Sequence, residues 1–65
     1  MKTTWTPAAI RLLREALGQD RAAFARHFRL SEHAVKRWEL GQDRPSGPVT
    51  VLLDQIQARL PAEVA

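Results

Sequence analysis

A short run of charged side chains between positions 32 and 37 has the residue types and the spacing to recognise a polyanion. Its members are Glu32, His33, Lys36 and Arg37. Helical periodicity places these side chains on one face of a helix and places Val35 and Trp38 on the opposite face. A helix with one apolar and one mostly basic face can pack on a core and still enter the major groove of DNA.

The two basic side chains of this face suit different contacts. The guanidinium of Arg37 can donate two hydrogen bonds to guanine, so we expect it to read a base. The flexible ammonium of Lys36 acts as a point charge and suits a phosphate better. The preceding helix would then cross the phosphate backbone, with Arg21 in its first turn.

Catalytic and metal-binding chemistries find little support. The chain has no cysteine and no glycine-rich phosphate loop, and Ser31 and Ser46 both have structural roles available to them. His27 and His33 lack the cysteine or suitably spaced acidic residues that would complete a metal site. The sequence therefore predicts a non-enzymatic protein with no cofactor, no metal and no small-molecule ligand.

Length and composition indicate one small domain over residues 1–65, with a net charge of +3 and arginine as eight of its ten basic residues. Arginine suits bidentate contacts to phosphate and guanine, so this balance favours a nucleic-acid partner. The absence of cysteine, of a signal-peptide pattern and of an 18-residue apolar run predicts a cytoplasmic protein that does not span a membrane.

Turn and cap residues divide the chain into four helical windows, 6–17, 20–28, 31–40 and 48–60, followed by a tail at 61–65. Thr6, Asp20 and Ser31 are candidate N-caps, and the "RPSGP" segment separates the last helix. No strand-like alternation occurs, so we expect an all-α bundle of four to five helices. The apolar residues expected to form its core are Ile10, Leu13, Leu17, Phe24, Ala25, Phe28, Val35, Trp38, Val49, Leu52, Leu53, Ile56 and Leu60.

A few apolar residues point away from these stripes. They are Leu12, Val51, Ala58 and Val64. Together they predict either a dimer contact or a few ordinary exposed side chains.

The stretch "ALGQDRAAFARHFRLSEHAVKRWELGQDRPSGP" resembles the phage repressor and Cro-like helix-turn-helix family, also called the Xre family, and its relatives among bacterial antitoxins. The resemblance extends from Ile10 to about Leu60. Its most specific residues are Phe24-Ala25-Arg26, Ser31, Val35, Arg37-Trp38-Glu39 and Gly41.

The resemblance implies a lambda-repressor-like helix-turn-helix, with 20–28 as the supporting helix and 31–40 as the recognition helix. Base contacts would fall on Glu32, His33 and Arg37. Backbone contacts would fall on Arg21, in place of a phosphate-binding glutamine, and on Gln42 and Arg44 in the following loop. Arg14 and Glu39 match a pair that forms a partly buried salt bridge in related proteins. A salt bridge to Arg14 would also explain why Glu39 places a negative charge close to the proposed DNA-binding face.

Two positions depart from the family pattern. Glu32 brings a carboxylate to a polyanion, where it could accept from a cytosine amino group or simply favour its own helix N-terminus. Arg29 replaces the glycine that is common in the turn, and arginine adopts a left-handed conformation only at some cost.

We therefore expect a sequence-specific transcriptional regulator, a repressor or autorepressor that binds a pseudo-palindromic operator as a homodimer. The alternative is an antitoxin or other protein-interaction module that neutralises a partner protein, with DNA binding secondary. The sequence does not indicate the operator or the regulated gene.

Overall fold

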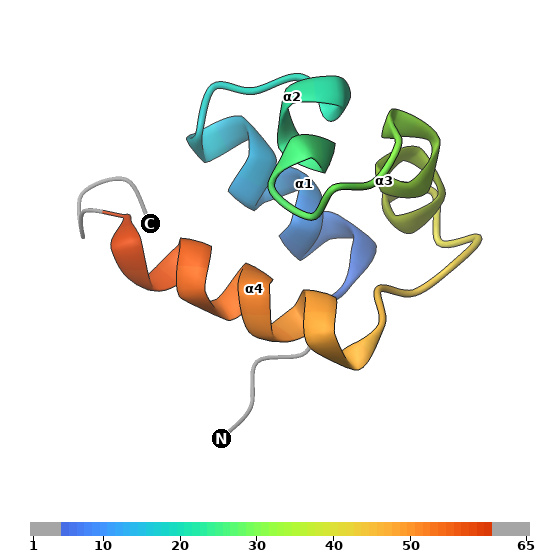
Figure 1. Cartoon of the computed structure of the whole chain (residues 1–65). Helices are drawn as coiled ribbons and strands as arrows, with labels where there is room; N and C mark the ends of the chain where they lie inside the picture. The colour runs from blue at the N-terminus through green and yellow to red at the C-terminus, as the bar shows by residue number, and fades with distance from the viewer. Residues whose placement is uncertain (1–4, 61–65) are drawn as a thin grey trace.

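The computed structural model describes residues 5–60, which form four helices (Figure 1). The helices are α1 (Pro7–Ala16), α2 (Arg21–Arg26), α3 (Glu32–Glu39) and α4 (Gly47–Arg59). This part of the chain contains no strand, so the predicted all-α class is confirmed, with four helices and no fifth over residues 5–60. No helix in the same range combines the length and the apolar character needed to cross a membrane.

Local capping explains where the first two helices begin. The side-chain hydroxyl of Thr6 accepts from the amide of Ala9 at 3.1 Å, and the carboxylate of Asp20 accepts from the amide of Ala23 at 2.8 Å. Ser31 has the extended backbone of an N-cap, but its side chain makes no capping hydrogen bond. The helices therefore begin close to the predicted positions, although the hydroxyl of Ser31 does not make the capping hydrogen bond that we expected.

The core lies where α1, α2 and α3 meet and is closed by one residue of α4. The buried apolar residues are Ile10, Leu13, Phe24, Ala25, Phe28, Ala34, Val35, Trp38 and Leu53. Phe28 packs edge to face against Phe24, with ring centroids 5.2 Å apart, and against Trp38, with centroids 5.7 Å apart. These aromatic contacts fix α2 against α3.

The apolar stripe of α4 is narrower than predicted. Leu53 is fully buried, and Val49, Ile56 and Leu60 pack against the core beside it. Leu52, which we expected in the core, is 38% exposed. It is adjacent to Leu53 in a helix, so its side chain points about 100° away from the buried stripe.

The turn between α2 and α3 contains one strained residue. Arg29 has a φ of 56°, which lies in the left-handed region that favours glycine. The amide of Leu30 donates to the carbonyl of Ala25 at 3.1 Å, the six-to-one hydrogen bond that often accompanies such a residue after a helix. The chain therefore makes this turn with arginine and keeps the left-handed backbone.

Replacing Arg29 with glycine should stabilise the protein. The left-handed conformation costs an L-residue about 1–2 kcal/mol, and the extra freedom of glycine in the unfolded chain offsets part of that gain. We expect Arg29→Gly to raise the free energy of unfolding by about 0.5–1 kcal/mol in urea denaturation. Arg26→Gly, at the exposed last residue of α2, is the matched control and should lower the free energy of unfolding. A higher free energy of unfolding in Arg26→Gly together with a lower one in Arg29→Gly would contradict the strain at Arg29.

Candidate nucleic-acid interface

Helix α3 has two distinct faces. Ala34, Val35 and Trp38 are buried against the other helices. The opposite side chains are all exposed, and they are Glu32, His33, Lys36 and Arg37. The structure thus brings the three predicted base-contacting residues and Lys36 onto one accessible surface.

A single carboxylate holds α3 to the rest of the molecule. Glu39 accepts from Arg14 through both oxygens, with Nε at 2.7 Å from Oε2 and Nη2 at 3.1 Å from Oε1. The remaining nitrogen of Arg14, Nη1, donates to the carbonyl of Gln19 at 3.0 Å. The ion pair that the resemblance implied is therefore present as a bidentate contact between α1 and α3.

A second arginine joins this pair. Nε of Arg21, at the start of α2, donates to Oε1 of Glu39 at 3.3 Å. The side chain of Arg21 is 36% exposed, whereas that of Glu39 is 2% exposed. Arg21 is thus hydrogen-bonded to a buried carboxylate and still accessible to solvent. The spacing of residues in the sequence could not predict its contact with Glu39.

The two arginines set the ionisation of Glu39. Burial by itself raises the pKa of this carboxyl, but hydrogen bonds and charges from Arg14 and Arg21 outweigh it, and the pKa of Glu39 is lowered overall. The hydrogen bond to Glu39 likewise raises the pKa of Arg14. Glu39 therefore stays ionised beside Arg14, and by formal charge the cluster of Arg14, Arg21 and Glu39 carries one positive charge in excess.

The loop after α3 folds back over the end of that helix. The amides of Gln42 and Asp43 donate to the carbonyl of Arg37 at 2.9 and 3.3 Å. This places Oδ2 of Asp43 at 3.9 Å from Nε of Arg37, an exposed and therefore weak ion pair. Sequence reasoning missed Asp43 because it lies beyond the helix, where helical spacing does not apply.

The other predicted contact residues and the two histidines lie at the surface. Gln42 and Arg44 are exposed in the loop between α3 and α4. His27 is exposed, and its Nε2 lies 2.9 Å from Oε1 of Gln19. Among residues 5–60, no three histidine, aspartate or glutamate side chains are grouped so that they could hold a metal ion.

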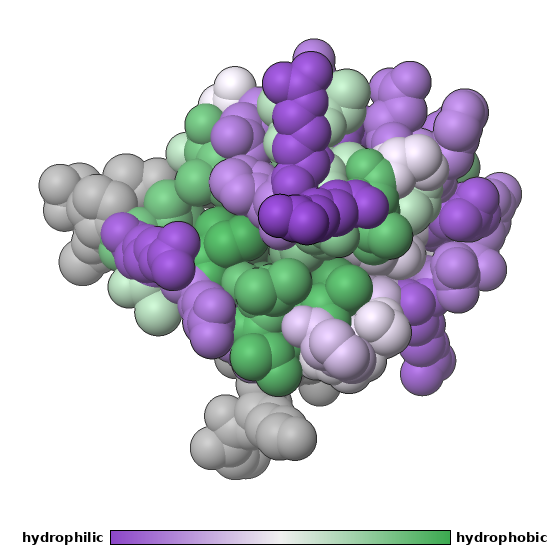
Figure 2. All heavy atoms as spheres, viewed as in Figure 1, coloured by the Kyte–Doolittle hydropathy of each residue, from purple (hydrophilic) through white to green (hydrophobic). Residues whose placement is uncertain are grey.

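The predicted dimer-contact residues are exposed, but on two helices. Leu12 on α1 is 63% exposed and Val51 on α4 is 54% exposed. Ala58 is also exposed and lies seven residues after Val51, on the same side of α4. Figure 2 shows hydrophobic residues over the middle of α4, whereas hydrophilic residues lie at its C-terminal end and along the outer edge beside α3 and the loop that follows it. Val64 lies outside the described residues.

Comparison of the chain with family models, with curated proteins and with solved structures finds no match.

Removing the carboxylate of Glu39 should destabilise the protein strongly. Glu39→Gln leaves two arginines beside a buried group that can no longer neutralise them, so we expect the free energy of unfolding to fall by about 3 kcal/mol at pH 7. Because the folded pKa of Glu39 is lowered, its contribution is present above the unfolded pKa and is lost as pH falls through the folded pKa. The difference from the parent chain should thus begin to shrink as the pH falls below about 5, near the unfolded pKa of a glutamate, and should continue to shrink at lower pH.

Asp43→Asn is the matched control, because it removes an exposed carboxylate next to a single arginine. We expect a change below about 0.5 kcal/mol in the same denaturation series. Equal effects of the two substitutions, or a difference for Glu39→Gln that does not vary with pH, would contradict the role assigned to Glu39.

Proposed function

We propose that this protein is a sequence-specific regulator of transcription that binds double-stranded DNA through a helix-turn-helix formed by α2 and α3. The observation that carries the proposal is the exposed Glu32, His33, Lys36 and Arg37 face of α3, on a helix whose other face is locked into the core. A helix held in this way can place its side chains in the major groove with little loss of conformational freedom on binding.

The residues around α3 support a division between base reading and backbone binding. Arg37 is the leading candidate for a guanine contact, and His33 projects from the first turn of the same helix. Arg21, Lys36, Gln42 and Arg44 would bind phosphates. In this arrangement the positive excess of the cluster formed by Arg14, Arg21 and Glu39 faces a phosphate through the accessible side of Arg21.

Glu32 has two possible roles in this complex. As the acidic residue in the first turn of α3, it stabilises the positive end of the helix dipole. On the recognition face it could also accept a hydrogen bond from the amino group of cytosine.

The proposed active form is a homodimer on a pseudo-palindromic operator, with two recognition helices about 34 Å apart, one turn of DNA. Leu12, Val51 and Ala58 are the predicted contact residues that lie exposed within residues 5–60. The protein would act in a bacterial or phage-infected cytoplasm as a repressor or autorepressor and would carry no catalytic activity.

Random-sequence selection on duplex DNA, followed by binding titrations at several salt concentrations, tests the proposal. We expect one enriched motif and an affinity that falls as salt rises, because phosphate contacts release counterions. Arg37→Ala should relax the preference at one base position, by about 1–3 kcal/mol. Arg21→Ala should weaken binding to all sequences alike and reduce the salt slope by about 1.

Arg59→Ala, which removes a positive charge from the far end of α4, is the control for both variants. It should change neither the motif nor the salt slope beyond the small effect of net charge. Unfolding curves must be recorded for Arg21→Ala, since this change also removes a hydrogen bond to Glu39. The absence of an enriched motif, or the same behaviour of Arg37→Ala and Arg21→Ala, would contradict the proposed interface.

The dimer can be tested separately by sedimentation equilibrium in the presence and absence of operator DNA. Val51→Asp places a charge in the exposed apolar surface of α4 without entering the core, so we expect it to weaken dimerisation and leave the unfolding free energy within about 0.5 kcal/mol. A protein that stays monomeric on and off DNA would contradict the homodimer.

The exposed Val51 and Leu52 also support a second candidate function, an antitoxin or other module that binds a partner protein through α4. The two functions separate cleanly by mutation. Binding of such a partner would persist in Arg37→Ala and fail in Val51→Asp, whereas operator recognition would be altered directly by Arg37→Ala.

A further inference from the structure

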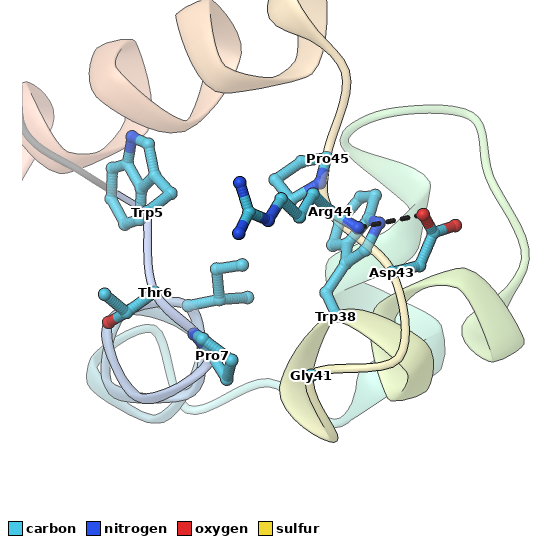
Figure 3. A pocket seen from close by; sticks show the side chains of 9 residues that line it. Trp5, Thr6, Pro7, Trp38, Gly41, Asp43, Arg44 and Pro45 are labelled. Atoms are coloured by element: carbon cyan, nitrogen blue, oxygen red, sulfur yellow. Dashed lines mark hydrogen bonds between the residues drawn. The ribbon is translucent and has the colours of Figure 1, made fainter.

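A hollow of about 290 Å³ lies on a part of the molecule that the proposed base contacts do not use (Figure 3). It is bounded by the segment before α1, by the end of α3 and by the loop that leads to α4. The residues that line it include Trp5, Pro7, Ile10, Trp38, Asp43 and Arg44. Its volume is at the small end of the range for ligand pockets, so only a compact molecule would fit.

The walls of the hollow are mostly apolar and are held in place from outside it. Trp38 is buried and packs against Phe28. Trp5 is half-buried, and its Nε1 donates to Oδ1 of Asp54 on α4 at 2.7 Å. Because each indole is anchored by a neighbour that does not line the hollow, the space between them exists without a ligand.

One cation enters this apolar space. The side chain of Arg44 extends from the loop into the hollow, toward Trp5 (Figure 3). Within residues 5–60 its guanidinium makes no ion pair with a carboxylate. Asp43 also lines the hollow, but both oxygens of its carboxylate face other groups: Oδ1 accepts from the backbone amide of Arg44 at 2.9 Å, and Oδ2 lies 3.9 Å from Nε of Arg37.

Two indole rings and a guanidinium with no ion-pair partner among residues 5–60 favour a flat anion as the ligand. An aromatic ring gains from packing against the indoles and the apolar side chains below them. A carboxylate on that ring matches the planar fork of a guanidinium and can accept two parallel hydrogen bonds from it. A neutral aromatic ring would lose the hydrogen bonds to the guanidinium, and a small aliphatic acid would lose the packing against the indoles.

We propose that this hollow binds a small aromatic carboxylate, with the ring between Trp5 and Trp38 and the carboxylate on Arg44. No motif in the sequence indicates such a ligand, because the residues come from three separate segments that only the fold brings together. No proposed base-contacting residue lines the hollow, but Arg44 is also a proposed phosphate contact, so the test is made in the absence of DNA.

The test is a titration of the full chain with benzoate, followed by nitrogen-15 NMR. The chain has two tryptophans, so its two indole N–H signals report directly on the two walls. We expect saturable shifts of both indole signals and of the Arg44 amide, with a Kd of about 1 mM. Benzamide, which keeps the ring but not the charge, and acetate, which keeps the charge but not the ring, should each bind at least about tenfold more weakly.

Arg44→Gln should reduce benzoate affinity about tenfold, whereas Arg59→Gln, the same change outside the hollow, should leave it unaltered. Because Arg44 is exposed, we expect Arg44→Gln to leave the fold intact. A spectrum that is unchanged except near residue 44 will confirm that the variant is folded. Benzoate shifts that do not saturate, benzamide binding as tight as benzoate binding, or an unchanged affinity in Arg44→Gln would each overturn the proposal. Because Arg44 is also a proposed phosphate contact, operator recognition is judged from Arg37→Ala and Arg21→Ala and not from Arg44→Gln.

Discussion

The structure depends on the buried carboxylate of Glu39 and the two arginines that neutralise it. A negative charge in the last turn of a helix is unfavourable, because it meets the negative end of the helix dipole. Burial adds a desolvation cost that only well-placed partners can offset. Arg14 and Arg21 supply those partners from α1 and α2, with both carboxylate oxygens occupied. Three helices are therefore joined at one point by charge as well as by apolar packing.

This junction explains how a chain of 65 residues can present a firmly held charged helix. Val35 and Trp38 seat one face of α3 in the core, and Glu39 fixes its end relative to α1 and α2. The polar face of α3 therefore does not pack against the rest of the protein and is accessible to a partner. Helix α4 is attached differently, by the apolar stripe around Leu53 and by the hydrogen bond from Trp5 to Asp54, which leaves Val51 and Leu52 exposed.

Local features of the fold could be predicted from the sequence because they depend on near neighbours. Thr6 and Asp20 cap the helices that their positions indicated, and the two faces of α3 follow from helical spacing alone. The pair formed by Arg14 and Glu39 is 25 residues apart, so spacing could not define it, and a resemblance to a family was needed to suggest it.

The features that could not be predicted from the sequence all depend on how the helices and loops pack together in three dimensions. The exposure of Leu52 depends on how α4 is rotated over the core. The bond between Arg21 and Glu39 requires the ends of two helices to meet, and the hollow beside Arg44 requires three segments to converge. None of these distances is encoded in a periodic pattern within one element.

The central claim, that the polar face of α3 binds DNA while Glu39 keeps that helix in place, is tested most directly by a chemical-shift map. Nitrogen-15-labelled protein would be titrated with a duplex that carries its selected site. We expect the largest shifts on residues 32–37, on Arg21 and on residues 42–44, with smaller shifts on α4 around the dimer-contact residues Val51 and Ala58. Shifts concentrated on α4, with the amides of α3 unchanged, would contradict the claim.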